Sequence, residues 1–217
     1  MSVMAFTTFL KYRAKRLLAP LLFRYPPIGL QPERLHLWLD TVIATQDVPG
    51  TVVEIGCHLG GTAAFAARMM TRQGDQRAYT CIDTFGGFVT SEFDEDLKLG
   101  NTESNRHLFA DNGPDLTRWV LDRHGAPNVK LIQGDIASLS PTLIPDPISA
   151  CLIDVDLAQP IEAAMEIVTQ RLSPGGRILV DDCPEEYDWQ ARKGYEAFMT
   201  KAGLTPSYKA GMGLFTQ

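Results

Sequence analysis

The sequence predicts an α/β protein built on a mostly parallel β-sheet. Residues 150–153 and 178–180 are short apolar runs containing β-branched side chains, and such runs are typical of strands buried on both faces. Between them, residues 160–172 carry apolar side chains at helical spacing, and Pro160 suits the first position of a helix. The turn residues 173–176 are expected to end this helix. A strand, a helix and a second strand in this order favour two parallel, neighbouring strands.

Four carboxylates follow these two strands. Asp154 and Asp156 come after the first strand, and Asp181 and Asp182 come directly after the second. The carboxyl ends of neighbouring parallel strands lie at the same edge of the sheet, where open α/β sheets bind their ligands. Acids gathered there would repel one another, and a hard divalent cation with oxygen ligands would relieve that repulsion. The sequence therefore predicts a metal site at this edge.

A glycine-rich turn follows the first predicted strand, residues 51–55. The strand carries Glu54, the turn includes Gly56, His58 and Gly60, and an alanine-rich helix is expected directly after it. Glycines let a backbone approach a bound ligand closely, so a strand, a glycine turn and a helix start can form a nucleotide-binding element. The turn has neither the lysine of a phosphate-binding loop nor the G-x-G-x-x-G pattern, and by itself it could also be a plain tight turn.

Two further predicted strands end in acids and make the nucleotide-binding interpretation more specific. The strand expected over residues 78–82 is followed by Asp83, at about the distance from the glycine turn where a carboxylate binds ribose hydroxyls. The strand expected over residues 129–133 is followed by Gly134 and Asp135. A carboxylate at that place can accept a hydrogen bond from the exocyclic amine of a base. Three strand ends therefore present groups that suit an adenosine compound.

Composition is that of one globular enzyme domain and argues against several other classes. The chain has 217 residues, 45% of them hydrophobic, and a net charge of −6, which disfavours nucleic acid as a partner because that would need a basic face. It has no apolar run of the roughly 18 residues that a transmembrane helix needs. The four cysteines form no C-x-x-C pair and are expected to be buried, reduced thiols, which are typical of a cytoplasmic protein.

Residues 1–46 differ in character from residues 47–217, which we expect to form the main domain. Residues 1–25 contain five basic and no acidic side chains, and we expect a basic amphipathic helix that stops near Pro20. This segment would cover a pocket mouth or join two subunits of a homodimer, with attachment to a membrane surface as the alternative. A second helix is predicted over residues 32–46, and its inward stripe consists of Leu35, Trp38, Leu39, Val42 and Ile43.

The insert between the second and third predicted strands, residues 88–112, is polar and begins on the ligand side of the sheet. It would form a mobile lid that excludes water, or else a plain solvated loop. His107 is the one histidine of the insert and a candidate general base, with a surface or lid-packing role as the alternative.

These motifs resemble those of class I S-adenosylmethionine-dependent methyltransferases and, within that class, the macrocin O-methyltransferase family. The resemblance rests on residues 53–61 and 82–87, and above all on the spacing between residues 153–157 and 172–182. It implies a Rossmann-like, doubly wound, seven-stranded sheet that is mostly parallel, with N-terminal helices added. It also implies an antiparallel last strand, from a hairpin over residues 205–216.

The same resemblance implies the cofactors and the residues that bind them. Mg²⁺ would be held by Asp154, Asp181 and Asp182, and the acceptor would be a hydroxyl of a small molecule such as a natural-product sugar. Asp154 or His107 would take the proton from this hydroxyl. S-adenosylmethionine would contact Glu54, Gly56, His58, Gly60, Asp83, Thr84, Asp135 and Ile136.

Two other classes of protein are compatible with the sequence. One is a different α/β enzyme that binds an adenosine compound, such as a hydroxylase-like relative or an aminopropyl transferase. The other is a non-catalytic S-adenosylmethionine-binding protein, which would have no need for the acids at Asp154, Asp181 and Asp182.

Overall fold

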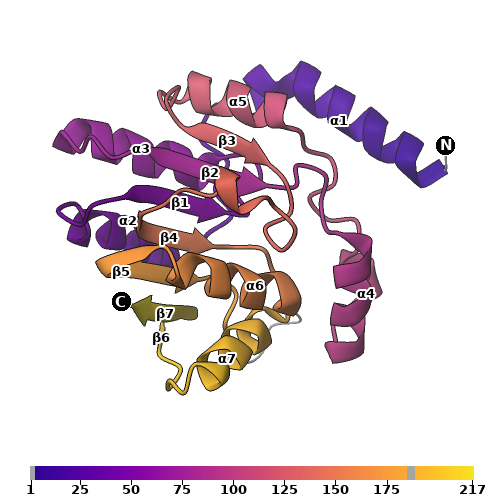
Figure 1. The fold of residues 1–217 in the computed structure, drawn as a ribbon. Helices are drawn as coiled ribbons and strands as arrows, with labels where there is room; N and C mark the ends of the chain where they lie inside the picture. The colour runs from indigo at the N-terminus through magenta and orange to yellow at the C-terminus, as the bar shows by residue number, and fades with distance from the viewer. Residues whose placement is uncertain (1–2, 185–188) are drawn as a thin grey trace.

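One twisted sheet forms the centre of the molecule (Figure 1). The computed structural model describes residues 3–184 and 189–217, and within them seven strands form the sheet in the order β3-β2-β1-β4-β5-β7-β6. The first five strands are parallel, and β7 pairs antiparallel with β5 and with the edge strand β6. The predicted fold class is therefore confirmed. The strands are β1 Thr51–Ile55, β2 Tyr79–Asp83, β3 Lys130–Gln133, β4 Ile148–Ile153, β5 Leu172–Val180, β6 Tyr208–Lys209 and β7 Met212–Thr216.

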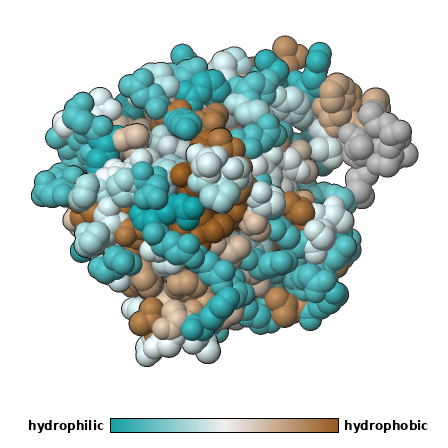
Figure 2. All heavy atoms as spheres, in the orientation of Figure 1, coloured by the Kyte–Doolittle hydropathy of each residue, from teal (hydrophilic) through white to brown (hydrophobic). Residues whose placement is uncertain are grey.

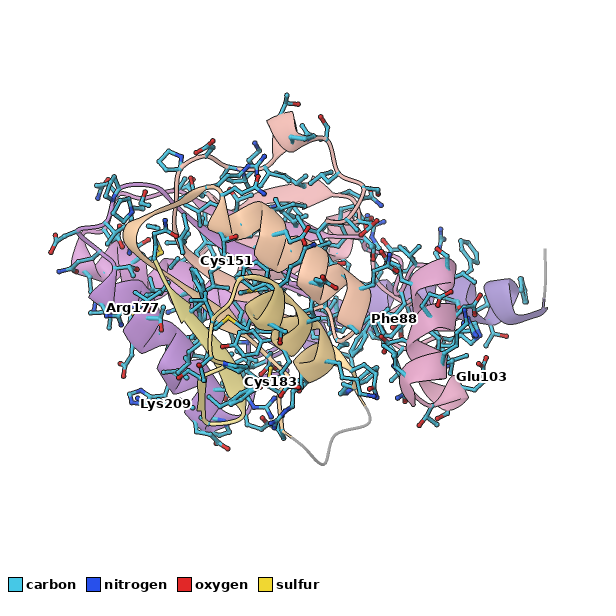
Figure 3. All side chains as sticks on the ribbon, turned by 60° about the horizontal axis from the view of Figure 1, so that its bottom comes forward. Phe88, Glu103, Cys151, Arg177, Cys183 and Lys209 are labelled. Carbon is cyan, nitrogen blue, oxygen red and sulfur yellow. The ribbon has the colours of Figure 1, made fainter. Side chains whose placement is uncertain are left out.

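Helices cover both faces of the sheet, as a doubly wound fold requires (Figure 1). Because side chains alternate along a strand, Cys151 of β4 belongs to one apolar core and Leu152 to the other. The core that contains Cys151, which Figure 3 labels, is closed by α6 (Ala158–Thr169) and α7 (Ala191–Lys201). The other core is closed by α2 (Pro32–Ala44), α3 (Gly61–Gln73) and α5 (Pro114–Arg123).

The segment after α6 differs from the prediction. The helix ends at Thr169 rather than near residue 172, and residues 173–176 belong to β5 rather than to a turn. Leu172 pairs with Ile148, but the next pairs start at Arg177, so the residues between them bulge out of the ladder. Turn-forming residues in such a bulge give the same sequence signal as a turn that ends a helix.

The two N-terminal helices also differ from the prediction at their ends. α1 spans Val3–Leu22 and continues through Pro20, which lies in its last turn and has no N–H to donate to the carbonyl of Arg16. α2 ends at Ala44, and Ile43 is 37% exposed, so its predicted inward position was wrong. Trp38 is fully buried in the core that α2, α3 and α5 close, and α2 is therefore an integral part of the fold.

α1 lies along α5 at the outside of the molecule (Figure 1). Ala19 of α1 and Phe23 just after it pack into a small apolar cluster with Leu116 and Val120 of α5. Lys15 forms an ion pair of 2.8 Å with Asp111, and Arg16 pairs with Asp115. None of the helices in the described part of the chain is long and apolar enough to cross a bilayer.

The insert between β2 and β3 is a helical unit rather than a plain solvated loop. It contains α4 (Thr90–Leu99) and a short 3-10 helix, η1 (Glu103–Asn105); a second such helix, η2 (Pro141–Leu143), precedes β4. Asp96 of α4 is buried, and its carboxylate accepts hydrogen bonds from the backbone N–H of Ala158, 2.8 Å, and from the Asn101 side chain, 2.9 Å. The first contact caps the N-terminus of α6, where a negative charge is favourable. The insert is thus anchored to the main domain.

Candidate active site

A cavity opens at the carboxyl ends of β1, β2, β4 and β5. It lies where β1 is flanked by β2 on one side and by β4 on the other, which is the switch point where open α/β sheets bind ligands. Gly60 and His107, two of the predicted site residues, are not part of its wall. The predicted residues that line it are Glu54, Gly56, His58, Asp83, Thr84, Asp135, Ile136, Asp154, Asp181 and Asp182.

Gly56 allows the end of β1 to pass close to β4. Its φ is +90°, and a Cβ atom built on it would lie 1.8 Å from the backbone oxygen of Asp154. On either side, the Gly56 N–H donates to Ile82 and the Asp154 N–H donates to Ile55, both at 2.8 Å. Gly60 has a different local role, since it precedes α3 in the left-handed conformation and packs beside α5.

The linker between α1 and α2 forms part of the cavity wall. Pro27, Gly29 and Gln31 line the cavity, and a Cβ on Gly61 would lie 1.8 Å from the carbonyl oxygen of Pro27. Glycine at the start of α3 therefore lets the linker cross that helix. The N-terminal segment contributes to the pocket through this linker.

Two carboxyls, the half-buried Asp83 and the buried Glu54, face the cavity from the ends of β2 and β1. The Asp83 carboxylate accepts backbone N–H hydrogen bonds from His58 and Phe85, each at 2.7 Å. Burial raises the pKa of Asp83, and these N–H groups oppose the shift. Burial also raises the pKa of Glu54 to about 8, and the Tyr79 hydroxyl donates a hydrogen bond to it.

The turns after β2 and β3 are held by their own polar side chains. The Thr84 hydroxyl donates to the carbonyl of Gly87 at 2.6 Å. Asp135 accepts hydrogen bonds from the Ala137 N–H, 2.9 Å, and the Ser138 hydroxyl, 2.8 Å. Ile136 is buried and lines the cavity. These turns give the cavity one wall of fixed backbone.

Three acids come together at the ends of β4 and β5. One carboxylate oxygen each from Asp154, Asp156 and Asp182 can be chosen so that all three lie within 4.8 Å of one another. Burial and the neighbouring acids raise the pKa of Asp154 and of Asp156 well above the ordinary value. Asp156 and Asp182 also have positive φ angles, 64° and 52°, which side chains rarely adopt outside functional sites. This cluster has the oxygen ligands and the charge that a divalent cation needs.

Arg34 of α2 is a site residue that the sequence did not suggest. Its side chain is 4% exposed, and one guanidinium nitrogen donates to Asp181 at 2.9 Å and to Asp182 at 2.7 Å. Burial and Asp182 raise the pKa of Asp181 to about 6, and Arg34 opposes that shift. Asp181 therefore faces a guanidinium, and the compact acid cluster contains Asp156 in its place.

The two histidines of interest lie in different surroundings. The His58 ring is in edge contact with Phe109, with 5.1 Å between the ring centroids, and burial lowers its pKa to about 4, so it is neutral at pH 7. Its Nε2 atom is buried and has no hydrogen-bond partner among the described residues. His107 is exposed on the insert, and the structure does not bring it to the acids.

The fold is shared with solved O-methyltransferases, on which the chain superposes. It matches the O-methyltransferase NovP with a TM-score of 0.72 at 16% sequence identity, covering 98% of both chains. It matches CalS11, a calicheamicin methyltransferase, with a TM-score of 0.65 at 20% identity, covering 100% of this chain and 93% of that one.

The chain belongs to the macrocin-O-methyltransferase (TylF) family, because residues 28–207 match that family. The resemblance predicted from the strand-end motifs is thereby confirmed. A curated relative from Streptomyces olivaceus, 8-demethyl-8-(2,3-dimethoxy-alpha-L-rhamnosyl)-tetracenomycin-C 4'-O-methyltransferase, is 28% identical over 164 residues. The match covers 71% of this chain and 61% of the length of the relative.

Proposed function

We propose that the protein is an S-adenosylmethionine-dependent O-methyltransferase that uses Mg²⁺ and acts on a hydroxyl of a small molecule, such as a sugar of a natural product. The observation that carries this proposal is the meeting, in one cavity, of Glu54 and Asp83 with the acids Asp154, Asp156 and Asp182. The names of two similar proteins support a sugar hydroxyl: one acts on a rhamnosyl tetracenomycin, and the other is a TDP-rhamnose 3'-O-methyltransferase.

The donor half of the cavity suits S-adenosylmethionine. When bound, this cofactor supplies a methyl group on a positively charged sulfonium. Asp83 would accept hydrogen bonds from the ribose hydroxyls, because two backbone N–H groups already fix its carboxylate. Asp135 and Ile136 would form the side of the cavity that holds the base, and Gly56 leaves the backbone close to the ligand.

The acid cluster fits a hard divalent cation. Mg²⁺, when bound, supplies a Lewis acid that makes an aliphatic hydroxyl easier to ionise. We assign its ligands to Asp154, Asp156 and Asp182, because one oxygen of each belongs to the compact group. Arg34 would balance charge beside the site, since it pairs with both Asp181 and Asp182. This set keeps two of the three acids that the family resemblance implies.

Asp154 would receive the proton of the acceptor hydroxyl at a carboxylate oxygen. Its carboxylate belongs to the acid cluster and lines the cavity, which suits a proton acceptor beside the metal-bound hydroxyl. We do not assign this role to His107, since it is exposed and is not part of the cavity wall. Positioning of donor and acceptor in line by the cavity walls would supply much of the remaining rate enhancement.

Replacing Asp83 by asparagine is expected to weaken S-adenosylmethionine binding by about ten-fold to a hundred-fold, because a charge-assisted hydrogen bond contributes ~1.5–3 kcal/mol. Isothermal titration calorimetry would measure the dissociation constant, and thermal unfolding would show that the variant is folded. Asp47→Asn is the matched control, since Asp47 is exposed and outside the cavity. An unchanged dissociation constant in folded Asp83→Asn would remove Asp83 from the donor site.

We also propose that two copies of the chain associate through α1. Successive residues of a helix are turned by about 100°, and on this basis the side of α1 opposite α5 carries an apolar stripe. The stripe consists of Phe6 (49% exposed), Leu10 (49%), Leu17 (81%) and Leu21 (63%). An exposed apolar stripe is unusual for a monomer surface; in Figure 2 apolar side chains are visible over α1 at the upper right.

The buried, free cysteines support the cytoplasmic location expected from the sequence.

The double replacement Leu17→Glu and Leu21→Glu is expected to convert a dimer to a monomer, because it places charge on the exposed stripe and leaves the α5 contacts of Ala19 intact. Light scattering would measure the mass of the wild type and of the variant. Leu204→Glu, at an exposed leucine of similar character far along the chain, is the control that should leave the mass unchanged. A monomeric wild type, or a variant that stays dimeric, would contradict the assignment.

A further inference from the structure

Three aromatic side chains lie together in the cavity wall and are not among the residues assigned above to the donor or to the acid cluster. Phe88, Phe109 and Trp189, here called the aromatic shelf, all line the cavity. Their ring centroids are 5.7 Å apart for Phe88 and Phe109, 5.8 Å for Phe88 and Trp189, and 6.4 Å for Phe109 and Trp189. Three separate segments supply them, before α4, before α5 and before α7. Figure 3 shows Phe88 on the side of α4 that faces the sheet.

One member of the shelf, Phe109, is exposed at a cost in backbone strain, whereas Phe88 and Trp189 are half-buried. Phe109 is 39% exposed, although a large apolar side chain gains from burial. Its φ is 61°, a left-handed conformation that is unfavourable for a bulky residue. The ring is held against Phe88 and against His58. Strain that presents an apolar ring to a cavity indicates a surface for ligand binding.

The charge of the cavity selects against anions. Eight acidic side chains line it, whereas Arg34 is its one permanently charged cation among the described residues, and Arg34 is bound to Asp181 and Asp182. His58 is neutral at pH 7, since burial lowers its pKa to about 4. Residues 185–188 are outside the described structure, and their sequence, Glu-Glu-Tyr-Asp, contains no basic side chain.

Two cations from neighbouring segments are also engaged by acids. Lys15 pairs with Asp111 at 2.8 Å, and Arg106 pairs with Glu103 at 2.6 Å and with Asp94 at 2.8 Å. A diphosphate is normally bound by arginine or lysine side chains that are available to it. In this cavity it would instead meet eight acidic side chains, whose charge exceeds that of Arg34 and the proposed Mg²⁺ together.

We propose that the acceptor is an uncharged glycoside whose flat, apolar group stacks on the aromatic shelf, and that sugar nucleotides and coenzyme A thioesters are rejected. This inference rests on the proposed function and deepens it. The sugar would lie toward the acid cluster, and the aglycone would cover Phe88, Phe109 and Trp189. Offset stacking and apolar burial favour such a group, and no phosphate has to be neutralised.

Three acceptors with the same sugar test the inference: 2-naphthyl α-L-rhamnoside, methyl α-L-rhamnoside and thymidine-diphosphate-rhamnose. Binding to the protein with S-adenosylhomocysteine and Mg²⁺ would be measured by calorimetry, and methyl transfer by label from S-adenosylmethionine. The naphthyl glycoside should bind at least ten-fold more tightly than each of the other two. Trp189→Ala and Phe109→Ala should each weaken naphthyl glycoside binding by about three-fold to ten-fold, while methyl glycoside binding changes by less than two-fold.

Phe65→Ala is the matched control, since Phe65 of α3 is also 39% exposed but is not part of the cavity wall. The inference is overturned if the nucleotide sugar binds as tightly as the naphthyl glycoside, if none of the three binds, or if the shelf variants affect both glycosides equally. Shelf-dependent binding of the naphthyl glycoside without methyl transfer would support the shelf and contradict the proposed function. The two failures are therefore distinguishable.

Discussion

Replacing Asp154 by asparagine is expected to reduce methyl transfer by at least about a thousand-fold and to leave S-adenosylmethionine affinity within about three-fold. Asp154 supplies both an oxygen of the acid cluster and the candidate proton acceptor, so one substitution removes two contributions. The donor contacts of Asp83 lie at a different strand end and are not changed. Turnover would be measured with a saturating acceptor, and donor binding by calorimetry.

Asp181→Asn is the comparison that separates the two possible ligand sets. If Asp154, Asp156 and Asp182 hold the metal, Asp156→Asn and Asp182→Asn should be as damaging as Asp154→Asn, and Asp181→Asn should cost no more than about ten-fold. If Asp181 is a ligand, its replacement should be the more damaging one, and Asp156→Asn should be mild. Wild-type turnover in Asp154→Asn would contradict both sets.

Replacing Gly56 by alanine should lower the free energy of unfolding by about 2–6 kcal/mol, the sum of positive-φ strain and overpacking. The new methyl group would lie 1.8 Å from the backbone oxygen of Asp154, so β1 and β4 would have to separate where the cavity begins. Donor binding should be lost with the local geometry. Urea unfolding followed by fluorescence would measure the change.

Gly74→Ala is the matched control for this substitution. Gly74 also has a positive φ, +74°, but a Cβ built there meets nothing within 4 Å. Gly74→Ala should therefore lower the free energy of unfolding only by the backbone strain, about 1–2 kcal/mol. Equal losses in the two variants would show that the close approach of β1 to β4 is not what requires Gly56.

The strand-end part of the site could be predicted because its signals are local. A buried parallel strand is a short apolar run, and an acid directly after it has only one edge of the sheet to occupy. Asp83 and Asp154 were found in this way, and Glu54 was found from its place in the strand before the glycine turn. All three line the cavity. Gly56 was predicted to lie in a turn where the backbone makes a close approach. In the structure this close approach is to the backbone of Asp154 at the end of β4.

The remaining features depend on contacts between distant parts of the chain. Arg34 precedes its partner Asp181 by 147 residues, and nothing in the α2 pattern distinguishes it from a surface arginine. The aromatic shelf joins Phe88, Phe109 and Trp189 from three irregular segments, where no periodic signal exists. The choice between Asp156 and Asp181 as part of the cluster depends on where the carboxylate oxygens lie, so the sequence alone could not make it.

The most direct test of the proposed function is the transfer of an isotope-labelled methyl group from S-adenosylmethionine to 2-naphthyl α-L-rhamnoside, followed with Mg²⁺, after exhaustive chelation, and after Mg²⁺ is restored. We predict label on a sugar oxygen, loss of transfer on chelation and recovery when Mg²⁺ returns, because the crowded carboxylates of Asp154, Asp156 and Asp182 need a divalent counter-charge. Full transfer after chelation, or label on an atom other than oxygen, would contradict the proposal.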